Sequence, residues 1–222
     1  MAEQTTQPSS ELDRTAEEAG FYHEAALNAA WTGARFALGA LSFLYGSFAF
    51  AYFYLRSINS SNRWTGSGYH APQMGYGATI LALVVVSAIV QYVALTRIKA
   101  GAKSAWQVGA LVALVLGVAA VALQIVQLLN LPFPPGSSGF SSVFTGFYPV
   151  MLVSWLAAMI WLEILLMRAR PLPAISFVEQ PPTYAEAFAV QRFQSSLSAF
   201  TLIWNYLAAV TILFFVLFYL IA

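Results

Sequence analysis

The sequence predicts an all-α membrane protein, a polytopic bundle of five transmembrane helices. The first observation is the composition: of 222 residues, 59% are apolar and only 9% are charged, whereas soluble domains carry about 25% charged residues. The second is a set of five apolar runs, each long enough to cross a hydrocarbon core about 30 Å thick. The third is a net charge of +1, which leaves no basic surface for nucleic acid.

The chain divides into an acidic N-terminal tail, residues 1–30, and a five-helix transmembrane domain, residues 31–222. Within the tail, Ser10 followed by Asp13 predicts the cap of a short helix that leads into the membrane. We expect the rest of the tail to be partly disordered. Its acidic residues are Glu3, Glu11, Asp13, Glu17, Glu18 and Glu24.

The five apolar runs predict helices, because lipid offers the backbone no hydrogen-bond partner and a helix satisfies these groups internally. The expected spans are 33–55, 75–95, 106–129, 143–167 and 199–222. Short segments of alternating polarity, typical of a transmembrane β-barrel, are absent from the sequence. Two spans also carry stripes of small residues, which permit close approach between helices. The stripes are Gly109, Ala113 and Gly117 in the third span and Gly39, Ser42 and Gly46 in the first.

The distribution of Lys and Arg predicts a cytoplasmic N-terminus and a C-terminus outside the cell. Eight of the ten basic residues lie on the N-terminal side of the bundle, against two on the opposite side. Arg97, Lys99 and Lys103 form the strongest single determinant. The longest connection, residues 168–198, is therefore expected to be a partly ordered loop on the cytoplasmic face.

The residues offer no site for redox chemistry. The chain has no cysteine, and both histidines, His23 and His70, lie outside the spans. Haem in a membrane protein typically needs paired histidines, and copper needs His, Cys or Met. We therefore expect no metal ligands in this chain. We expect no catalytic residues either, because no Ser/His/Asp or Cys/His set can be assembled at one depth.

Arg35 and Glu163 are the only charged side chains inside the expected spans, and both lie near the cytoplasmic side. Because an unpaired charge is costly in hydrocarbon, the pattern predicts an intramembrane ion pair between them. Pairing of Glu163 with Arg168 is an alternative. A role for Glu163 in proton handling or in contact with a partner is another.

Several segments resemble subunit III of the haem-copper (cytochrome c) oxidases. The first span ends Ala51-Tyr52-Phe53-Tyr54-Leu55-Arg56 and is followed by Arg63-Trp64, similar to the family's A-Y-x-x-x-R ending before a tryptophan. The run from Leu123 to Leu128 resembles the family's L-Q-x-x-E-Y. The run from Gly139 to Phe147 looks like a shortened G-x-S-S-x-F…T-G-F-H.

The last span is similar to the family as well. Trp204-Asn205-Tyr206, with Tyr219 following, looks like the region of the family's W-H-F-V-D. The resemblance covers residues 35–222, and five helices match the short bacterial form of the subunit.

The departures from the family share one property, which is the loss of ionisable side chains inside the membrane. Leu41 stands where the family carries a buried Glu, with Ala40 in place of the usual Ser. The other neutral replacements are Gln127 for a Glu, Tyr148 for a His, Asn205 for a His and Ala208 for an Asp. Packing and lipid binding need shape and aromatic surface rather than titratable groups, so these roles survive the replacements.

The resemblance implies a non-catalytic subunit III of a terminal oxidase, a proton-translocating complex of aerobic electron transport that reduces oxygen to water. It implies partner subunits I and II, which would hold the haem and copper, and bound phospholipid. It places the chain in the bacterial inner membrane, where it would support enzyme stability and proton uptake. The positions carried over for lipid binding or subunit packing are Tyr52, Arg56, Gln124 and Trp204.

Two other functions stay open at the level of the sequence. One is a subunit-III-like accessory protein of a nitric oxide reductase, which would share the fold. The other is a small transporter or proton channel that uses Glu163 and the intramembrane glutamines.

Overall fold

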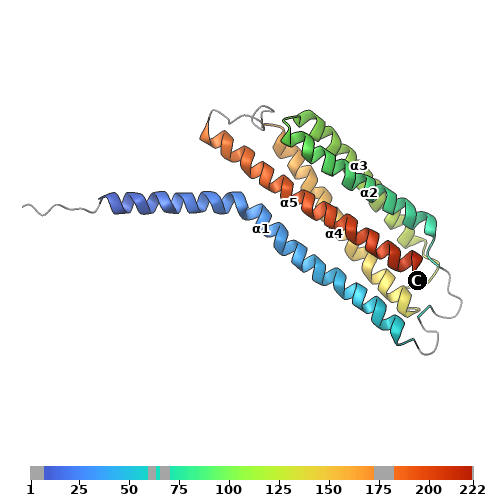
Figure 1. The fold of residues 1–222 in the computed structure, drawn as a ribbon. Coiled ribbons are helices and arrows are strands. Elements are labelled where there is room, and N and C mark those ends of the chain that lie inside the picture. Colours follow the sequence, from blue (N-terminus) through green and yellow to red (C-terminus); the bar gives the residue numbers. More distant parts are fainter. Residues whose placement is uncertain (1–7, 60–63, 66–70, 173–182, 222) are drawn as a thin grey trace, which may run out of the picture.

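The computed structural model describes residues 8–59, 64–65, 71–172 and 183–221, which fold into long helices (Figure 1). In chain order these are α1 (Pro8–Ser57), α2 (Met74–Lys99), α3 (Lys103–Leu129), α4 (Gly139–Ala169), α5 (Tyr184–Phe215) and the π-helical turn η2 (Val216–Leu220). Five of these helices are long and apolar enough to cross a membrane. The predicted all-helical, five-span architecture is thereby confirmed for the described residues.

Two helices extend by more than ten residues beyond the start of the span that hydropathy predicted. α1 runs unbroken for 50 residues, about 75 Å at 1.5 Å per residue, so the tail from Pro8 onward continues the first span instead of forming a separate short helix. α5 begins at Tyr184, which corrects the expectation of a loop over the whole of 168–198. Hydropathy detects only the apolar part of a helix. Both α1 and α5 begin with more polar residues, which hydropathy does not assign to a span. Residues 1–7 and 173–182 lie outside the described residues.

Hydrogen bonds from side chains fix where α4 and α5 begin. At α4, the Ser141 amide donates to Ser138 Oγ at 3.1 Å and the Ser138 amide donates to Ser141 Oγ at 2.9 Å, a reciprocal capping box. At α5, the Glu186 amide donates to Thr183 Oγ1 at 3.4 Å. Each bond satisfies an amide that would otherwise be unpaired at a helix start.

Close packing between α2 and α3 depends on small residues. Gly101 turns the chain between them with a φ of 81°, a left-handed conformation that glycine adopts without strain. Further along, a Cβ built on Gly109 would lie only 2.8 Å from the Cβ of Ala94. Ser87 Oγ donates to the carbonyl oxygen of Ala113 at 3.0 Å. Gly109 and Ala113 of the third span's small-residue stripe thus lie in this interface, whereas Gly117 faces Met159 on α4 and Trp204 on α5.

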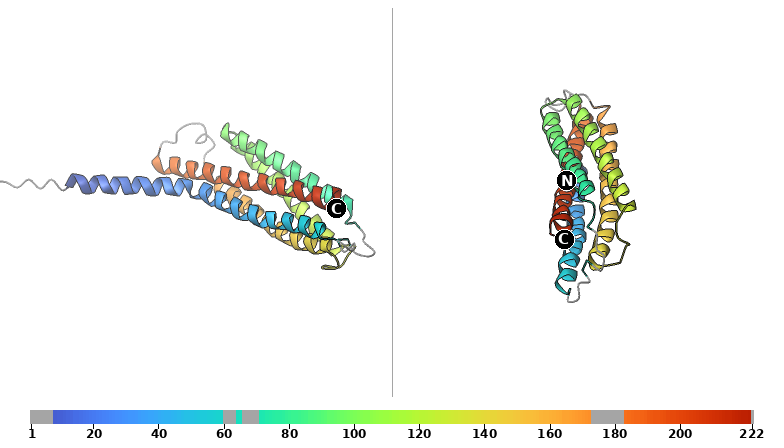
Figure 2. Two further views of the ribbon diagram at one scale, coloured as in Figure 1. Left: turned by 60° about the horizontal axis from the view of Figure 1, so that its bottom comes forward. Right: turned by 90° about the vertical axis from the view of Figure 1, so that its right-hand side faces the viewer.

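α5 occupies the middle of the bundle, where it packs against α1, α2 and α4, while α3 packs against α2 and α4 (Figure 2). α1 lies along α4 and α5, and its N-terminal part projects beyond the other helices (Figures 1 and 2). Stacked rings join α4 to α5, with Phe147 and Phe214 centroids 3.8 Å apart. Tyr45 on α1 donates its hydroxyl proton to Ser154 Oγ on α4 at 2.7 Å. The contacts of α1 with α4 and α5 cover one face of α1 and leave the opposite face uncovered.

Candidate functional site

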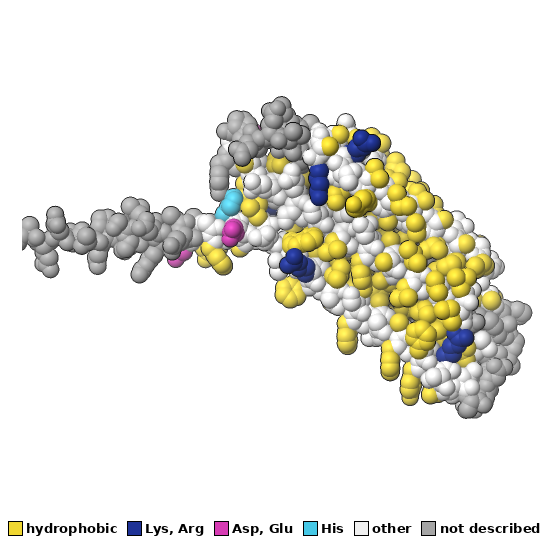
Figure 3. Space-filling view, viewed as in Figure 1, with side chains coloured by type: hydrophobic (Ala, Val, Ile, Leu, Met, Phe, Trp, Pro, Cys, Tyr) yellow, Lys and Arg dark blue, Asp and Glu magenta, His cyan; other side chains and the backbone are white. Residues whose placement is uncertain are grey.

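The uncovered face of α1 carries three phenylalanines spaced seven residues apart. Phe36, Phe43 and Phe50 are 76%, 81% and 70% exposed. Between them, Gly39 and Gly46 are exposed, and a Cβ built on either would have no atom within 4 Å. We name this surface, made of Phe36, Gly39, Phe43, Gly46 and Phe50, the α1 ridge. In Figure 3 a row of hydrophobic side chains projects along this edge of the molecule.

The α1 ridge alternates large and small side chains, as the contact faces of packed helices do. A seven-residue repeat keeps one stripe facing a neighbouring helix, and glycines between the rings allow a backbone to approach closely. From Phe36 to Phe50 the ridge is about 21 Å long at 1.5 Å per residue, which is most of the hydrocarbon thickness. The small-residue face predicted for the first span therefore has no partner within the described part of this chain.

Tyr52, one of the positions carried over from the resemblance to subunit III, lies on the opposite face of α1. Tyr52 is fully buried, and its hydroxyl donates to the carbonyl oxygen of Leu217 in η2 at 2.7 Å. Its ring meets that of Trp64 edge to face, with centroids 4.9 Å apart. Arg56 is exposed and donates from Nη1 to the Tyr52 hydroxyl at 3.2 Å. Tyr52 therefore packs inside the bundle, while Arg56 borders the surface.

Gln124 and Trp204 are also interior. Gln124 on α3 donates from Nε2 to the carbonyl oxygen of Tyr148 at 3.3 Å. Trp204 on α5 is fully buried and meets Trp155 edge to face at 4.9 Å. Lipid does not reach either side chain in this arrangement, so their contacts are with neighbouring helices of the same chain.

Three polar side chains join α3, α4 and η2 near the ends of these helices. Gln127 donates from its amide nitrogen to the hydroxyl of Tyr219. That hydroxyl lies 3.1 Å from the hydroxyl of Tyr148. A glycine makes room for the network, because a Cβ on Gly77 would overlap the Tyr219 ring. We call Gln127, Tyr148 and Tyr219 the tyrosine network.

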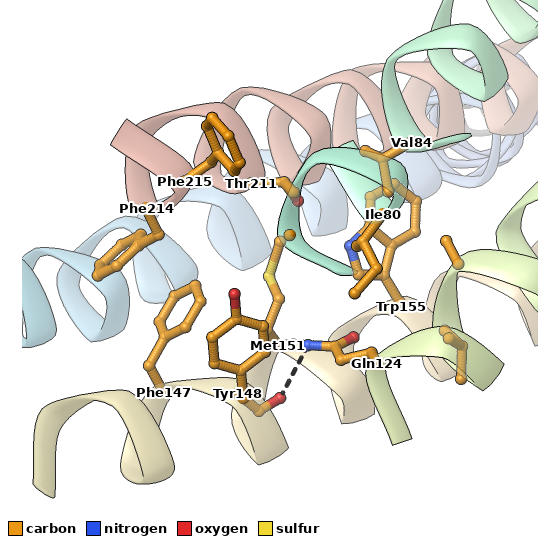
Figure 4. Close-up of a pocket in the computed structure, with 13 residues that line it drawn as sticks. Ile80, Val84, Gln124, Phe147, Tyr148, Met151, Trp155, Thr211, Phe214 and Phe215 are labelled. Carbon is orange, nitrogen blue, oxygen red and sulfur yellow. Dashed lines mark hydrogen bonds between the residues drawn. The ribbon is translucent and has the colours of Figure 1, made fainter. Parts of the chain in front are cut away.

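A small cavity lies beside the tyrosine network, between α2, α3, α4 and α5 (Figure 4). Figure 4 shows Gln124 bonded to the backbone of Tyr148 at its edge, with the rings of Phe147 and Phe214 alongside. Its volume is about 20 Å³, room for about one water molecule. A cavity of this size holds no organic cofactor.

Arg35 and Glu163 both lie on the surface, and no ion pair joins them within the described part of the chain. The Arg35 guanidinium instead lies 5.3 Å from the centre of the Trp31 ring. Glu163 shares the exposed side of α4 with Ile160 and Ile164. A carboxyl group on an apolar surface within a membrane span is costly unless a cation meets it.

Of the two histidines, the structure describes one. His23 lies on α1, where its ring is 4.6 Å from that of Phe188 on α5. His70 lies outside the described residues. Among the residues that the structure describes, no three His, Asp or Glu side chains are grouped as a metal site would require.

Sequence reasoning did not identify the α1 ridge as a surface or the tyrosine network as a unit. The seven-residue spacing of Phe36, Phe43 and Phe50 was available as a signal for the ridge. No pattern in the sequence pointed to contact between Gln127 and Tyr219, because the two residues are 92 positions apart.

No protein-family model matches the sequence, and no curated protein is significantly similar to it.

Proposed function

We propose that this chain is a non-catalytic subunit III of a haem-copper terminal oxidase, which docks on the catalytic subunit through the α1 ridge. Subunits I and II carry the haem and copper and reduce oxygen to water in aerobic respiration. The chain contributes stability to the complex, supports proton uptake and binds phospholipid. It lies in the bacterial inner membrane with its N-terminus in the cytoplasm.

The observation that carries this proposal is the uncovered face of α1. In the 18-residue apolar stretch of α1, only 11% of the residues are buried within this chain. The corresponding share is 33–50% in the other four spans. Phe43 protrudes where another helix could receive it, and Gly39 and Gly46 flank it with open space. Fluid lipid tails fit any pattern of side chains. A packed partner helix, in contrast, favours rings and glycines at regular spacing.

The tyrosine network supports the resemblance to subunit III. The resemblance aligns Gln127 with a Glu and Tyr148 with a His, and Tyr219 links these two positions through hydrogen bonds. Because Gln127 and Tyr148 are neutral, they form the hydrogen bonds with Tyr219 without burying a charge, which is costly in hydrocarbon. Leu41, aligned with the family's buried Glu, packs against the core of the bundle. The chain thus keeps the packing positions and lacks the titratable ones.

The exposed carboxyl group of Glu163 is a second observation in favour of a protein partner. Its carboxyl group is exposed on α4 without a basic partner in the described part of the chain. Inside membranes such groups pair with another charge. A basic residue on the partner would satisfy it.

The proposal is tested by purifying the tagged chain from its native membrane in mild detergent. Mass spectrometry of the accompanying chains and measurement of haem A and copper are the readouts. We expect a large haem- and copper-containing subunit at a fixed ratio to this chain. Haem with non-haem iron would instead assign the chain to a nitric oxide reductase. A stable, monodisperse chain without partners, active in flux across liposomes, would replace the proposal with a transporter.

Variants of the α1 ridge separate docking from general membrane insertion. Phe36→Ala with Phe43→Ala removes two rings of the ridge. Val108→Ala with Val115→Ala removes two exposed side chains, also seven residues apart, from α3. We expect the haem recovered per chain to fall severalfold in the first variant only. An equal loss in both variants would show that the ridge is not the docking surface.

A further inference from the structure

A pocket of about 450 Å³ lies between the C-terminal end of α4 and the first turns of α5. Its apolar lining includes Leu172 and Phe188, which are partly exposed, and Phe193, whose ring meets that of Trp106 edge to face at 5.5 Å. Two arginines line the same pocket, Arg168 from α4 and Arg192 from α5. The pocket therefore combines an apolar surface with two guanidinium groups.

Neither arginine has an acidic partner among the residues that the structure describes. Within the described ranges, no Asp or Glu forms an ion pair with Arg168 or Arg192, and both side chains are exposed. The neighbouring Lys103 is already engaged, since its ammonium group donates to the carbonyl oxygens of Arg170 and Leu172. The two arginines are thus the cations of this pocket that are available to an anion.

The pocket lies at the depth where lipid headgroups are found. Arg168 follows the apolar stretch of α4, whose membrane-spanning helix ends at Ala169. The α2–α3 connection, with Lys99 and Lys103 beside it, is at the same end of the bundle (Figure 1). Basic residues at a helix end mark the boundary between hydrocarbon and headgroups, so a ligand in this pocket can place one part in each region.

We infer that this pocket binds one anionic glycerophospholipid. Its phosphate pairs with the guanidinium groups of Arg168 and Arg192, since guanidinium forms paired hydrogen bonds with phosphate oxygens. An acyl chain lies beside Phe193 and continues into the hydrocarbon. Basic pockets between transmembrane helices recognise anionic headgroups in this way. The inference deepens the lipid-binding part of the proposed function and is independent of the oxidase partner.

The test uses the full chain, with any chains that accompany it, in nanodiscs that contain phosphatidylcholine with a small fraction of phosphatidylglycerol. Native mass spectrometry measures the lipid retained per chain. One variant, Arg168→Gln with Arg192→Gln, removes the two guanidinium groups of the pocket. The control, Arg97→Gln with Arg170→Gln, removes the same charge from exposed positions at the same end. A third variant, Arg168→Lys with Arg192→Lys, keeps the charge.

We expect one phosphatidylglycerol per chain, retained in preference to phosphatidylcholine. Retention should fall about tenfold in the glutamine variant of the pocket and stay within twofold of the wild type in the control. The lysine variant should retain the lipid, which shows that loss in the glutamine variant does not come from misfolding. An equal fall in the control would overturn the inference, because attraction by the whole basic end would then account for binding.

Inorganic phosphate provides the second arm of the test. Millimolar phosphate should not displace the lipid, because the acyl chain contributes to binding. Displacement at that concentration would show an anion site without lipid specificity and would overturn the inference. The assay requires no haem protein, so its result is separate from the test of the oxidase partner.

Discussion

The hydroxyl of Tyr52 on α1 donates a hydrogen bond to the carbonyl oxygen of Leu217 in η2, with a distance of 2.7 Å. This bond joins the first helix to the last turn of the bundle. Together with Tyr45 and Ser154, it fixes the rotation of α1 about its axis. That rotation directs Phe36, Phe43 and Phe50 away from the bundle.

Replacing Tyr52 with Phe should weaken the attachment of α1. The variant leaves the carbonyl oxygen of Leu217 without this donor, and hydrogen bonds between membrane helices contribute about 0.6 kcal/mol, up to about 1.7 kcal/mol. We expect a loss in this range in the free energy of unfolding, measured by reversible denaturation in mixed micelles. Tyr54→Phe is the control, because Tyr54 is exposed on the same helix. Equal stability of the two variants would contradict the assigned role of Tyr52.

The second prediction concerns Gly77. Alanine at this position would place a Cβ only 2.4 Å from a carbon of the Tyr219 ring, so the ring must move, and we expect the tyrosine network to be disturbed. Overpacking of this kind costs about 1–3 kcal/mol. Gly75→Ala is the matched control, because no atom lies within 4 Å of its added Cβ. We expect the melting temperature to fall for Gly77→Ala alone, and unchanged stability of that variant would show that the ring is placed elsewhere.

Gln91 on α2 provides the third prediction. The side chain is fully buried, and neither its amide nitrogen nor its amide oxygen has a hydrogen-bond partner within the described structure. Burying such a group without a partner costs about 1–3 kcal/mol, so Gln91→Leu should stabilise the chain by a comparable amount. Gln124→Leu should instead destabilise it, because Gln124 bonds to Tyr148. Destabilisation by Gln91→Leu in the same denaturation assay would reveal a polar partner for the amide.

The fourth prediction distinguishes two partners for Glu163. If a basic residue of another subunit meets this carboxyl group, Glu163→Gln should reduce co-purification severalfold, while Glu186→Gln, exposed near the start of α5, should not. Restored co-purification in Glu163→Arg with Arg35→Glu would instead establish the intrachain pair. The quantity measured is haem recovered per tagged chain.

The number and kind of helices could be predicted from the sequence because hydrocarbon thickness and backbone hydrogen bonding leave few alternatives. The start of α5 at Tyr184 could not be predicted from hydropathy, since its first turns carry polar residues such as Gln191 and Arg192. Hydropathy also does not separate the buried Tyr52 from the exposed Tyr54, because lipid-facing and helix-facing surfaces are equally apolar in a membrane protein. The side toward which Arg35 and Glu163 point depends on helix rotation, which their similar depth did not specify.

The most direct test of the α1 ridge is photo-crosslinking in the native membrane from a reactive side chain placed at Phe43, with Val115 on α3 as the reference position. Both positions are exposed in the chain itself, at 81% and 61%. We expect Phe43 to crosslink to one large haem-containing polypeptide and Val115 to crosslink to lipid. Crosslinking of Phe43 to lipid alone would contradict the claim that α1 docks on a catalytic partner.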